Sequence, residues 1–128
     1  MMKKEIEGIE DIKVLVDAFY SKVVKDSTIG YVFQDVQKVN WETHLPRMYS
    51  FWHTVLFGVM SYKGNPMLKH FYVNKNEPLS PTHFRIWLNL WEETIDNHFI
   101  GIKADLAKQR ANNMAIGIQK TLKIIDSV

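Results

Sequence analysis

Helical periodicity is the feature that most constrains what this chain can fold into. Apolar residues recur at steps of three and four along four long segments, and no segment shows the sustained alternation of a half-buried strand. The pattern predicts an all-α fold, and 128 residues suit one ordinary domain, so we expect a single domain over residues 1–128. The predicted helices run from about Ile9 to Lys25, from His44 to about Gly64, from Pro81 to about His98 and from about Lys103 to Ile125.

The start of the second helix has two candidate caps, Asn40 and Thr43. If Asn40 were the cap, Pro46 would lie beyond the first turn, where its ring clashes with the carbonyl of Glu42. If Thr43 is the cap, Pro46 takes the third helical position, where its missing N–H costs nothing. We therefore predict that this helix begins at His44. Its inward-facing side chains are then His44, Met48, Phe51, Trp52, Val55 and Val59.

Two cap-plus-proline pairs mark further helix starts. Asn65-Pro66 predicts a short helix over Met67–Phe71, which contains His70 and gives way to a polar stretch. Ser80-Pro81 repeats the signal and predicts the start of the third long helix.

Composition excludes several classes of function. The chain has no cysteine, which rules out disulfides, thiol catalysis and metal sites built from thiolates. Sixteen Lys and Arg against fourteen Asp and Glu leave a net charge of +2, too small to indicate a nucleic-acid-binding surface. No run approaches the ~20 apolar residues that span a bilayer, and no apolar segment follows the first lysines as in a signal peptide. We therefore expect a cytoplasmic protein without a nucleic-acid or membrane partner.

Histidines are the remaining candidates for chemistry. No two of them stand four apart on one helix with a glutamate between, so the zinc-protease spacing is absent. The chain also has no Gly-rich phosphate loop and no nucleophile-elbow motif. We expect His53 at the surface and His98 in a favourable interaction with the dipole at a helix C-terminus. The other three are His44, His70 and His83.

Aromatic content gives His44 and His70 a further interpretation. The chain holds four Trp, five Tyr and seven Phe, and His44 begins a stripe of large apolar side chains. Taken one at a time, these features describe partly buried imidazoles and an ordinary aromatic core. Together they are what a flat, apolar, metal-centred cofactor such as haem needs. The residues by themselves leave both interpretations open.

Several short motifs in a fixed order add a family resemblance. They cover about residues 19–92, with weaker similarity over Ala107–Ala111. On these motifs the chain resembles the truncated haemoglobins, specifically the third group, and it lacks the Gly-Gly pairs of the first two groups. The motifs are Phe19-Tyr20, Ile29–Phe33, Trp41–Met48, Phe51-Trp52, Tyr62–Met67, His70 and His83–Leu88.

The resemblance implies a fold and a set of site residues. The fold is a two-over-two helical globin sandwich around haem b (iron protoporphyrin IX), with a short helix that carries the proximal histidine. By position, His70 resembles the proximal iron ligand, and His83 and Arg85 are placed to meet a haem propionate. The distal wall would be Tyr20, His44, Met48 and Trp87. The remaining haem contacts would be Phe33, Phe51, Trp52, Phe71 and Phe84.

The resemblance also implies a function, the binding of dioxygen and other diatomic gases such as nitric oxide and carbon monoxide. A phenol and an indole N–H are donors that can hold dioxygen, because its outer atom gains negative charge from ferrous iron. Tight retention suits nitric oxide dioxygenation or peroxide reduction, with an external reductase, better than bulk oxygen transport. The alternative from another class is a haem-free all-α interaction module in which the aromatic residues are only core.

Overall fold

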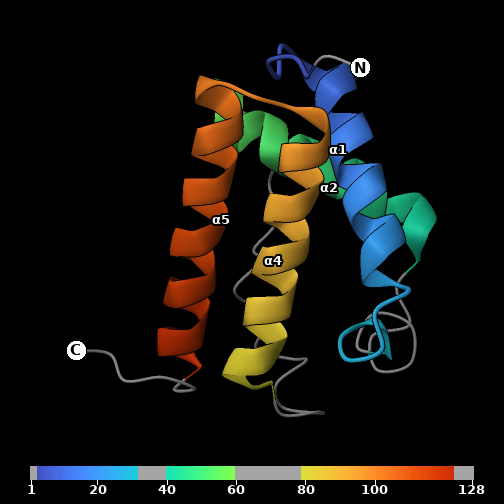
Figure 1. Cartoon of the computed structure of the whole chain (residues 1–128), viewed down its shortest axis with the longest axis vertical. Coiled ribbons are helices and arrows are strands. Elements are labelled where there is room, and N and C mark those ends of the chain that lie inside the picture. Colours follow the sequence, from blue (N-terminus) through green and yellow to red (C-terminus); the bar gives the residue numbers. More distant parts are fainter. Residues whose placement is uncertain (1–2, 32–39, 60–78, 123–128) are drawn as a thin grey trace.

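The computed structural model describes residues 3–31, 40–59 and 79–122, and most of these residues are helical (Figure 1). No strand occurs within these ranges, where one isolated bridge joins Lys4 and Phe99. The all-α prediction is confirmed. The helices are α1 (Ile9–Val23), α2 (Trp41–Phe57), α4 (Pro81–His98) and α5 (Ile102–Thr121).

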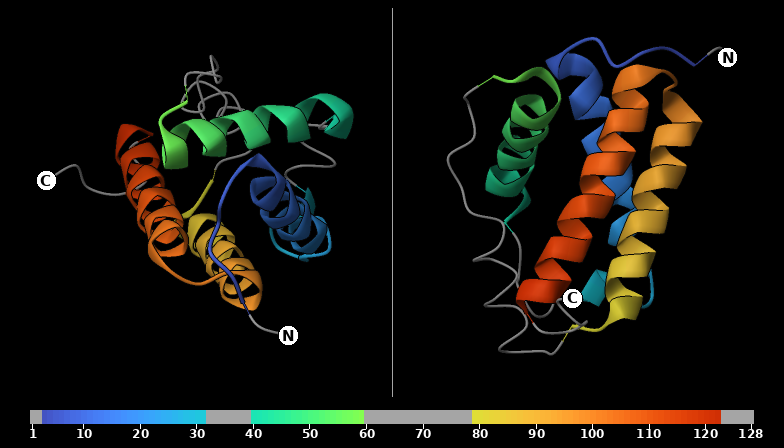
Figure 2. Two further views of the ribbon diagram at one scale, coloured as in Figure 1. Left: turned by 90° about the horizontal axis from the view of Figure 1, so that it is seen from above. Right: turned by 90° about the vertical axis from the view of Figure 1, so that its left-hand side faces the viewer.

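The four helices form two pairs that pack on one another. α1 packs on α2 and on α4, while α5 packs on α4 and on α2. α4 and α5 are antiparallel neighbours joined by a short turn, and α2 crosses the other three helices at a steep angle (Figure 2). This arrangement encloses the core between the pairs and agrees with the expected two-over-two sandwich. None of the described helices is long and apolar enough to cross a membrane.

The start of α2 differs from the prediction. The helix begins at Trp41, and the Asn40 side chain accepts a hydrogen bond from the Glu42 N–H at 3.1 Å. The Asn40 carbonyl also accepts from the His44 N–H at 2.9 Å, and Pro46 lies inside the helix. The predicted start at His44 was therefore wrong. Capping by Asn40 and the packing of Trp41 in the first turn together outweigh the local cost of proline.

The end of α2 also differs from the prediction. The helix stops at Phe57, because Gly58 adopts a left-handed conformation with φ 70° and its N–H donates to the Thr54 carbonyl at 3.0 Å. This is a common way for glycine to end a helix. Val59, which the predicted stripe turned inward, lies beyond this end and is 39% exposed.

The other boundaries lie close to the predicted ones. α4 spans the predicted residues Pro81–His98, α1 ends at Val23 rather than Lys25, and α5 begins at Ile102 rather than Lys103. The last helix ends earlier than predicted, because α5 stops at Thr121 with Leu122 as its C-cap rather than continuing to Ile125.

Small residues on α5 bring α4 and α5 close together. Ala104, Ala107, Ala111 and Ala115 are all buried and recur at steps of three and four. Their methyl groups leave room for the buried Trp91, whose Nε1 donates to the Ala107 carbonyl at 3.1 Å. The centre of the core is therefore a tryptophan whose polar atom is satisfied across the helix pair.

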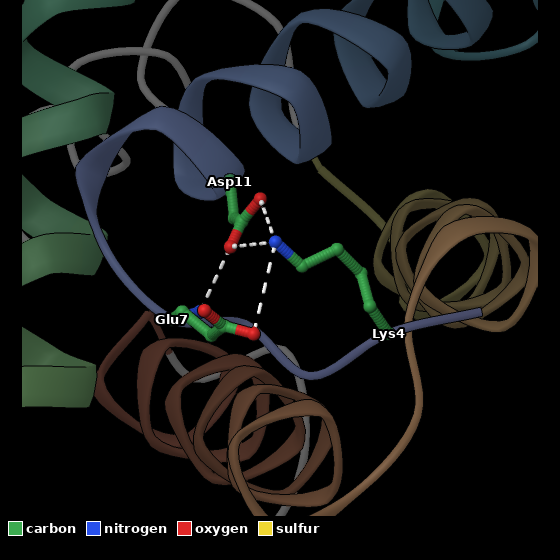
Figure 3. A network of polar contacts seen from close by, with 3 residues as sticks. All are labelled: Lys4, Glu7 and Asp11. Atoms are coloured by element: carbon green, nitrogen blue, oxygen red, sulfur yellow. Dashed lines mark hydrogen bonds and ion pairs between the residues drawn. The ribbon is translucent and has the colours of Figure 1, made fainter.

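Ion pairs and hydrogen bonds hold the N-terminal segment against the start of α1 and against the α4–α5 turn. The Lys4 ammonium lies 3.2 Å from the Asp11 carboxylate and 3.8 Å from that of Glu7 (Figure 3). Asp11 also accepts a hydrogen bond from the Glu7 N–H at 2.8 Å. The Lys4 carbonyl accepts from the Ile100 N–H at 2.9 Å, which links this segment to the turn.

Candidate functional site

Three rings from α1 and α2 meet at one end of the seam between these helices. The ring centroids lie 5.3 Å apart for Tyr20 and Trp41, 5.1 Å for Tyr20 and His44, and 5.4 Å for Trp41 and His44. The Tyr20–His44 and Trp41–His44 pairs meet edge to face, which is a favoured geometry for aromatic rings. The structure thus brings together two of the predicted distal residues, Tyr20 and His44.

Trp41 is a member of this cluster that the sequence analysis missed. It stands three residues before His44 in α2, so both side chains lie on one face of the helix. The predicted helix start at His44 left Trp41 outside the helix and hid this spacing. Asn40 as a cap followed by aromatic and imidazole residues three apart was the signal that could have found it.

Burial keeps the Tyr20 phenol protonated. The Tyr20 side chain is 8% exposed, and desolvation raises its pKa well above the ordinary value of about 10. A neutral phenol keeps its O–H, so Tyr20 remains a hydrogen-bond donor at any physiological pH.

Trp87 joins the cluster through Phe19. The Phe19 ring meets Tyr20 at 4.9 Å and Trp87 at 5.7 Å, and the Trp87 and Trp91 rings are nearly parallel at 6.4 Å. Trp87 is half-buried, and no described residue accepts a hydrogen bond from its indole N–H. The indole of Trp91, by contrast, is bonded to the Ala107 carbonyl. Of these two tryptophans, Trp87 is therefore the one whose indole N–H is available to donate a hydrogen bond to a ligand.

The other predicted residues of α2 have different surroundings. Met48 is half-buried against the core. Trp52 is 4% exposed and stacks on Trp91 at 4.5 Å, which is the environment of a core residue. Phe51 packs against Trp52 at 5.3 Å and lines a pocket of about 390 Å³ between α2 and α5. The other residues of this pocket are Val55, Arg110 and Met114.

At the start of α4, His83 has a structural role that was not predicted. Its Nδ1 accepts a hydrogen bond from the Ser80 N–H at 3.0 Å, and its Nε2 lies 3.3 Å from the Tyr31 hydroxyl. The ring therefore caps α4 and links it to the segment that follows α1. Its neighbour Arg85 is exposed, whereas Phe84 is buried in a small cluster with residues of α5.

The remaining predictions concern three residues that the structure does not describe and two further histidines. Phe33, His70 and Phe71 lie outside the described residues. His53 is half-buried rather than at the surface, and its ring contacts Phe57 at 5.7 Å, while His98 is exposed at the end of α4. Within the ranges that the structure covers, no three His, Cys, Asp or Glu side chains are grouped to hold a metal ion.

The described residues fit one side of a haem site. Aromatic rings from α1, α2 and α4 form a connected apolar cluster, and Tyr20 and Trp87 add an O–H and an N–H donor to it. No carboxylate takes part in these ring contacts. This combination suits an uncharged gas that gains negative charge when it binds iron.

Comparison with known proteins gives consistent results. Residues 4–120 match the model of the bacterial-like globin family. The chain is 32% identical over 124 residues to the group 3 truncated hemoglobin ctb of Campylobacter jejuni, covering 94% of this chain and 95% of that one. The crystal structure of a group III truncated hemoglobin from C. jejuni superimposes with a TM-score of 0.83 at 31% identity, with 94% of this chain and 95% of that one covered.

Proposed function

The chain belongs to the bacterial-like globin family, whose members bind diatomic gases at a haem, and we propose that this protein holds dioxygen through donors from Tyr20 and Trp87. The observation that carries the proposal is the pairing of a buried, protonated phenol with an indole N–H that no described residue engages. Both belong to one continuous cluster of rings, because Phe19 contacts each of them. His44 stands beside Tyr20 as a third donor or as a movable side chain.

The cofactor is haem b, which supplies an iron atom that binds the gas. We assign His70 as the proximal ligand, because neutral imidazole is a good iron ligand and the family resemblance places the proximal histidine there. Met48 completes the distal wall. Contacts to the porphyrin come from Phe33, Phe51, Phe71 and Phe84, with His83 and Arg85 toward the propionates. Trp52 supports the pocket from behind, through its stack on Trp91.

Tight retention by two donors favours chemistry on the gas over its transport. The reactions that suit such a pocket are nitric oxide dioxygenation and peroxide reduction. Either reaction draws electrons from an external reductase, which is then a partner of this protein.

The absorption spectrum of the purified protein tests the haem assignment directly. We expect an intense Soret band that shifts when carbon monoxide is added. A colourless protein that cannot be reconstituted with haem would instead identify a haem-free helical module.

Substitution of the proposed ligand tests which histidine holds iron. His70→Gly is expected to lose most of its haem, or to leave an iron site that added imidazole restores. His44→Leu, on the opposite face, is the control and is expected to keep its haem. An unchanged ferrous spectrum of His70→Gly without imidazole excludes His70, and equal haem loss from both variants means that the two faces are reversed.

A further inference from the structure

Three tryptophans of α4 and α2 stack on one another through the core. The Trp87 and Trp91 rings of α4 have centroids 6.4 Å apart, and their planes differ by only 5°. The Trp52 ring of α2 lies 4.5 Å from that of Trp91, with 23° between the planes. Trp91 and Trp52 are buried, whereas Trp87 is half-buried in the proposed distal wall. The stack therefore leads from the candidate gas site through the core to α2.

Stacked indoles can exchange single electrons. Indole is among the most easily oxidised side chains, and stacked rings bring their π-systems into direct contact. The Trp91 N–H donates to the Ala107 carbonyl, which is too weak a base to remove a proton from an oxidised indole. An oxidised Trp91 therefore keeps its positive charge. Because a positive charge is costly in an apolar core, Trp91 regains an electron from a neighbour that is easier to oxidise.

Tyr49 stands at the far end of the stack. It lies three residues before Trp52 in α2, so the two side chains are neighbours on one face of the helix. Tyr49 is half-buried, and its hydroxyl donates a hydrogen bond to the exposed carboxylate of Asp17 in α1. A phenol that loses an electron also gives up its proton readily, and a carboxylate that is already hydrogen-bonded can accept it. Tyr49 is therefore a residue from which the stack can draw an electron.

We propose that Trp87, Trp91, Trp52 and Tyr49 form a relay that carries single electrons from the protein surface to the distal site. At the surface, Tyr49 loses one electron to Trp52 and its hydroxyl proton to Asp17, which leaves a neutral phenoxyl radical beside a carboxylic acid. Each tryptophan passes one electron toward the site and receives one from the residue behind it, so none of the three is changed overall.

The oxidant and the reductant of the relay follow from peroxide reduction, and this part of the inference rests on the proposed function. Hydrogen peroxide accepts two electrons and two protons, its O–O bond breaks, and two water molecules form. Two electrons therefore pass along the relay for each peroxide. A phenolic reductant, ROH, returns each electron to the Tyr49 radical and releases a proton to solvent, while Asp17 gives its proton back to Tyr49. The balance is H2O2 + 2 ROH → 2 H2O + 2 RO•.

A tethered photo-oxidant tests the relay without any use of haem. Because the chain has no cysteine, Asn89→Cys allows one ruthenium polypyridyl label at an exposed position of α4, two residues from both Trp87 and Trp91. After a light flash with persulfate as the electron acceptor, the label removes one electron from the protein, and a nitroso spin trap captures the tyrosine radical. We expect peptide mapping by mass spectrometry to find the trap mainly on Tyr49. Capture mainly on any other tyrosine overturns the proposal.

Phenylalanine variants of the labelled protein show whether electrons pass through the stack. Trp91→Phe and Trp52→Phe each remove one indole of the relay, and we expect either to lower capture on Tyr49 several-fold. Trp41→Phe removes a half-buried indole outside the relay and is the matched control, expected to retain capture. Equal capture in all three variants overturns the relay. Trp52→Phe keeps this test decisive if Trp91→Phe does not fold.

Hydrogen peroxide tests the delivery of electrons to the distal site in the haem-loaded protein without the label. We expect the same spin trap to mark Tyr49 after peroxide is added, and Trp91→Phe and Trp52→Phe to lower this capture several-fold relative to Trp41→Phe. Equal capture in the three variants overturns the delivery of electrons to peroxide through the stack. If the light flash marks Tyr49 but no haem can be loaded, the proposed function fails while the electron relay stands.

Discussion

At the scale of single residues, Trp87 and Trp91 differ in whether their indole N–H is already hydrogen-bonded. Trp91 is 1% exposed and its N–H is bonded to the Ala107 carbonyl, so it is a structural residue. Trp87 lies parallel to it at 6.4 Å, yet its N–H has no acceptor among the described residues. Two side chains of the same type, one helical turn apart, are therefore expected to respond differently to the same substitution.

Tyr20→Phe or Trp87→Phe is predicted to speed dioxygen dissociation by about ten-fold to a hundred-fold. Each donor to a partly anionic ligand is worth roughly 1.5–3 kcal/mol, at ~1.4 kcal/mol per decade. Carbon monoxide dissociation is expected to change far less, because its outer atom carries little charge. The double variant is expected to deviate from additivity, since both donors share one acceptor. Stopped-flow ligand replacement measures all these rates.

Trp91→Phe is the matched control for that experiment. It leaves the Ala107 carbonyl without the indole and opens space in the core, so it is expected to lower the free energy of unfolding. The ratio of the dioxygen to the carbon monoxide dissociation rates should stay near that of the unmodified protein. If this ratio is also unchanged in the Tyr20 and Trp87 variants, neither residue contacts the gas.

Tyr49 predicts a loss of stability at alkaline pH. Desolvation, together with the hydrogen bond to Asp17 and its charge, raises the pKa of Tyr49 from about 10 to about 12. The folded protein therefore favours the neutral phenol, and this contribution to stability is complete below pH 10 and is lost as pH rises toward 12. Tyr49→Phe is expected to unfold less steeply with pH over this window. Equal pH profiles in denaturant titrations of the two proteins would show that the hydrogen bond between Tyr49 and Asp17 does not contribute to stability.

At the scale of elements, the first turn of α2 decides where the proposed distal residue His44 lies relative to Trp41. Trp41 and His44 share a face only because the helix begins at Trp41, and Asn40 makes that start favourable. Pro46 lies inside the helix. The free-energy cost of proline in a helix is therefore smaller than the combined stabilisation from the Asn40 cap and the packing of α2 against α1.

Asn40→Ala is predicted to lower the free energy of unfolding by about 1 kcal/mol, the usual effect of removing an asparagine cap. Thr43→Ala is the comparison, because Thr43 was the other candidate cap and its hydroxyl donates to the Asn40 carbonyl at 3.1 Å. We expect the smaller loss from Thr43→Ala. A larger loss at Thr43 than at Asn40, in denaturant unfolding, would favour a helix that starts at His44.

At the scale of the whole molecule, the N-terminal segment is held against the α4–α5 turn. Lys4 forms a bridge with Phe99, and the Glu5 side chain packs directly over Gly101. Gly101 has φ 105° and ψ −166°, a region that is essentially restricted to glycine. A Cβ atom there would lie 1.8 Å from the Glu5 carboxylate.

Gly101→Ala is accordingly predicted to destabilise the fold by about 1–3 kcal/mol from backbone strain alone. Glu5→Ala removes the steric contact but not the strain, so the double variant is expected to recover only part of the loss. Thermal or denaturant unfolding of the three variants measures both contributions. Full recovery in the double variant would mean that the clash with Glu5 is the whole effect.

The sequence by itself determined the elements of this protein and the family to which it belongs. The steps of three and four predicted both ends of α1 and α4 and the start of α5 to within about two residues, and Ser80-Pro81 located the start of α4 correctly, whereas α5 ends at Thr121 rather than at the predicted Ile125. These features are local, because they depend on neighbours within one or two turns of the same helix. The motif order added Tyr20, His44 and Trp87 as residues of one site through resemblance rather than through any local rule.

Only the tertiary structure decided where α2 begins, which indole keeps a donor to offer, and how His83 is used. Trp41 joins the ring cluster because its half-buried indole packs against Tyr20 of another helix, and the Trp91 N–H is bonded to a carbonyl sixteen residues away. His83 is linked to Tyr31, fifty-two residues earlier in the chain. Local periodicity cannot determine such outcomes, because the free energy that decides them comes from burial and hydrogen bonds between faces that meet only when the helices pack.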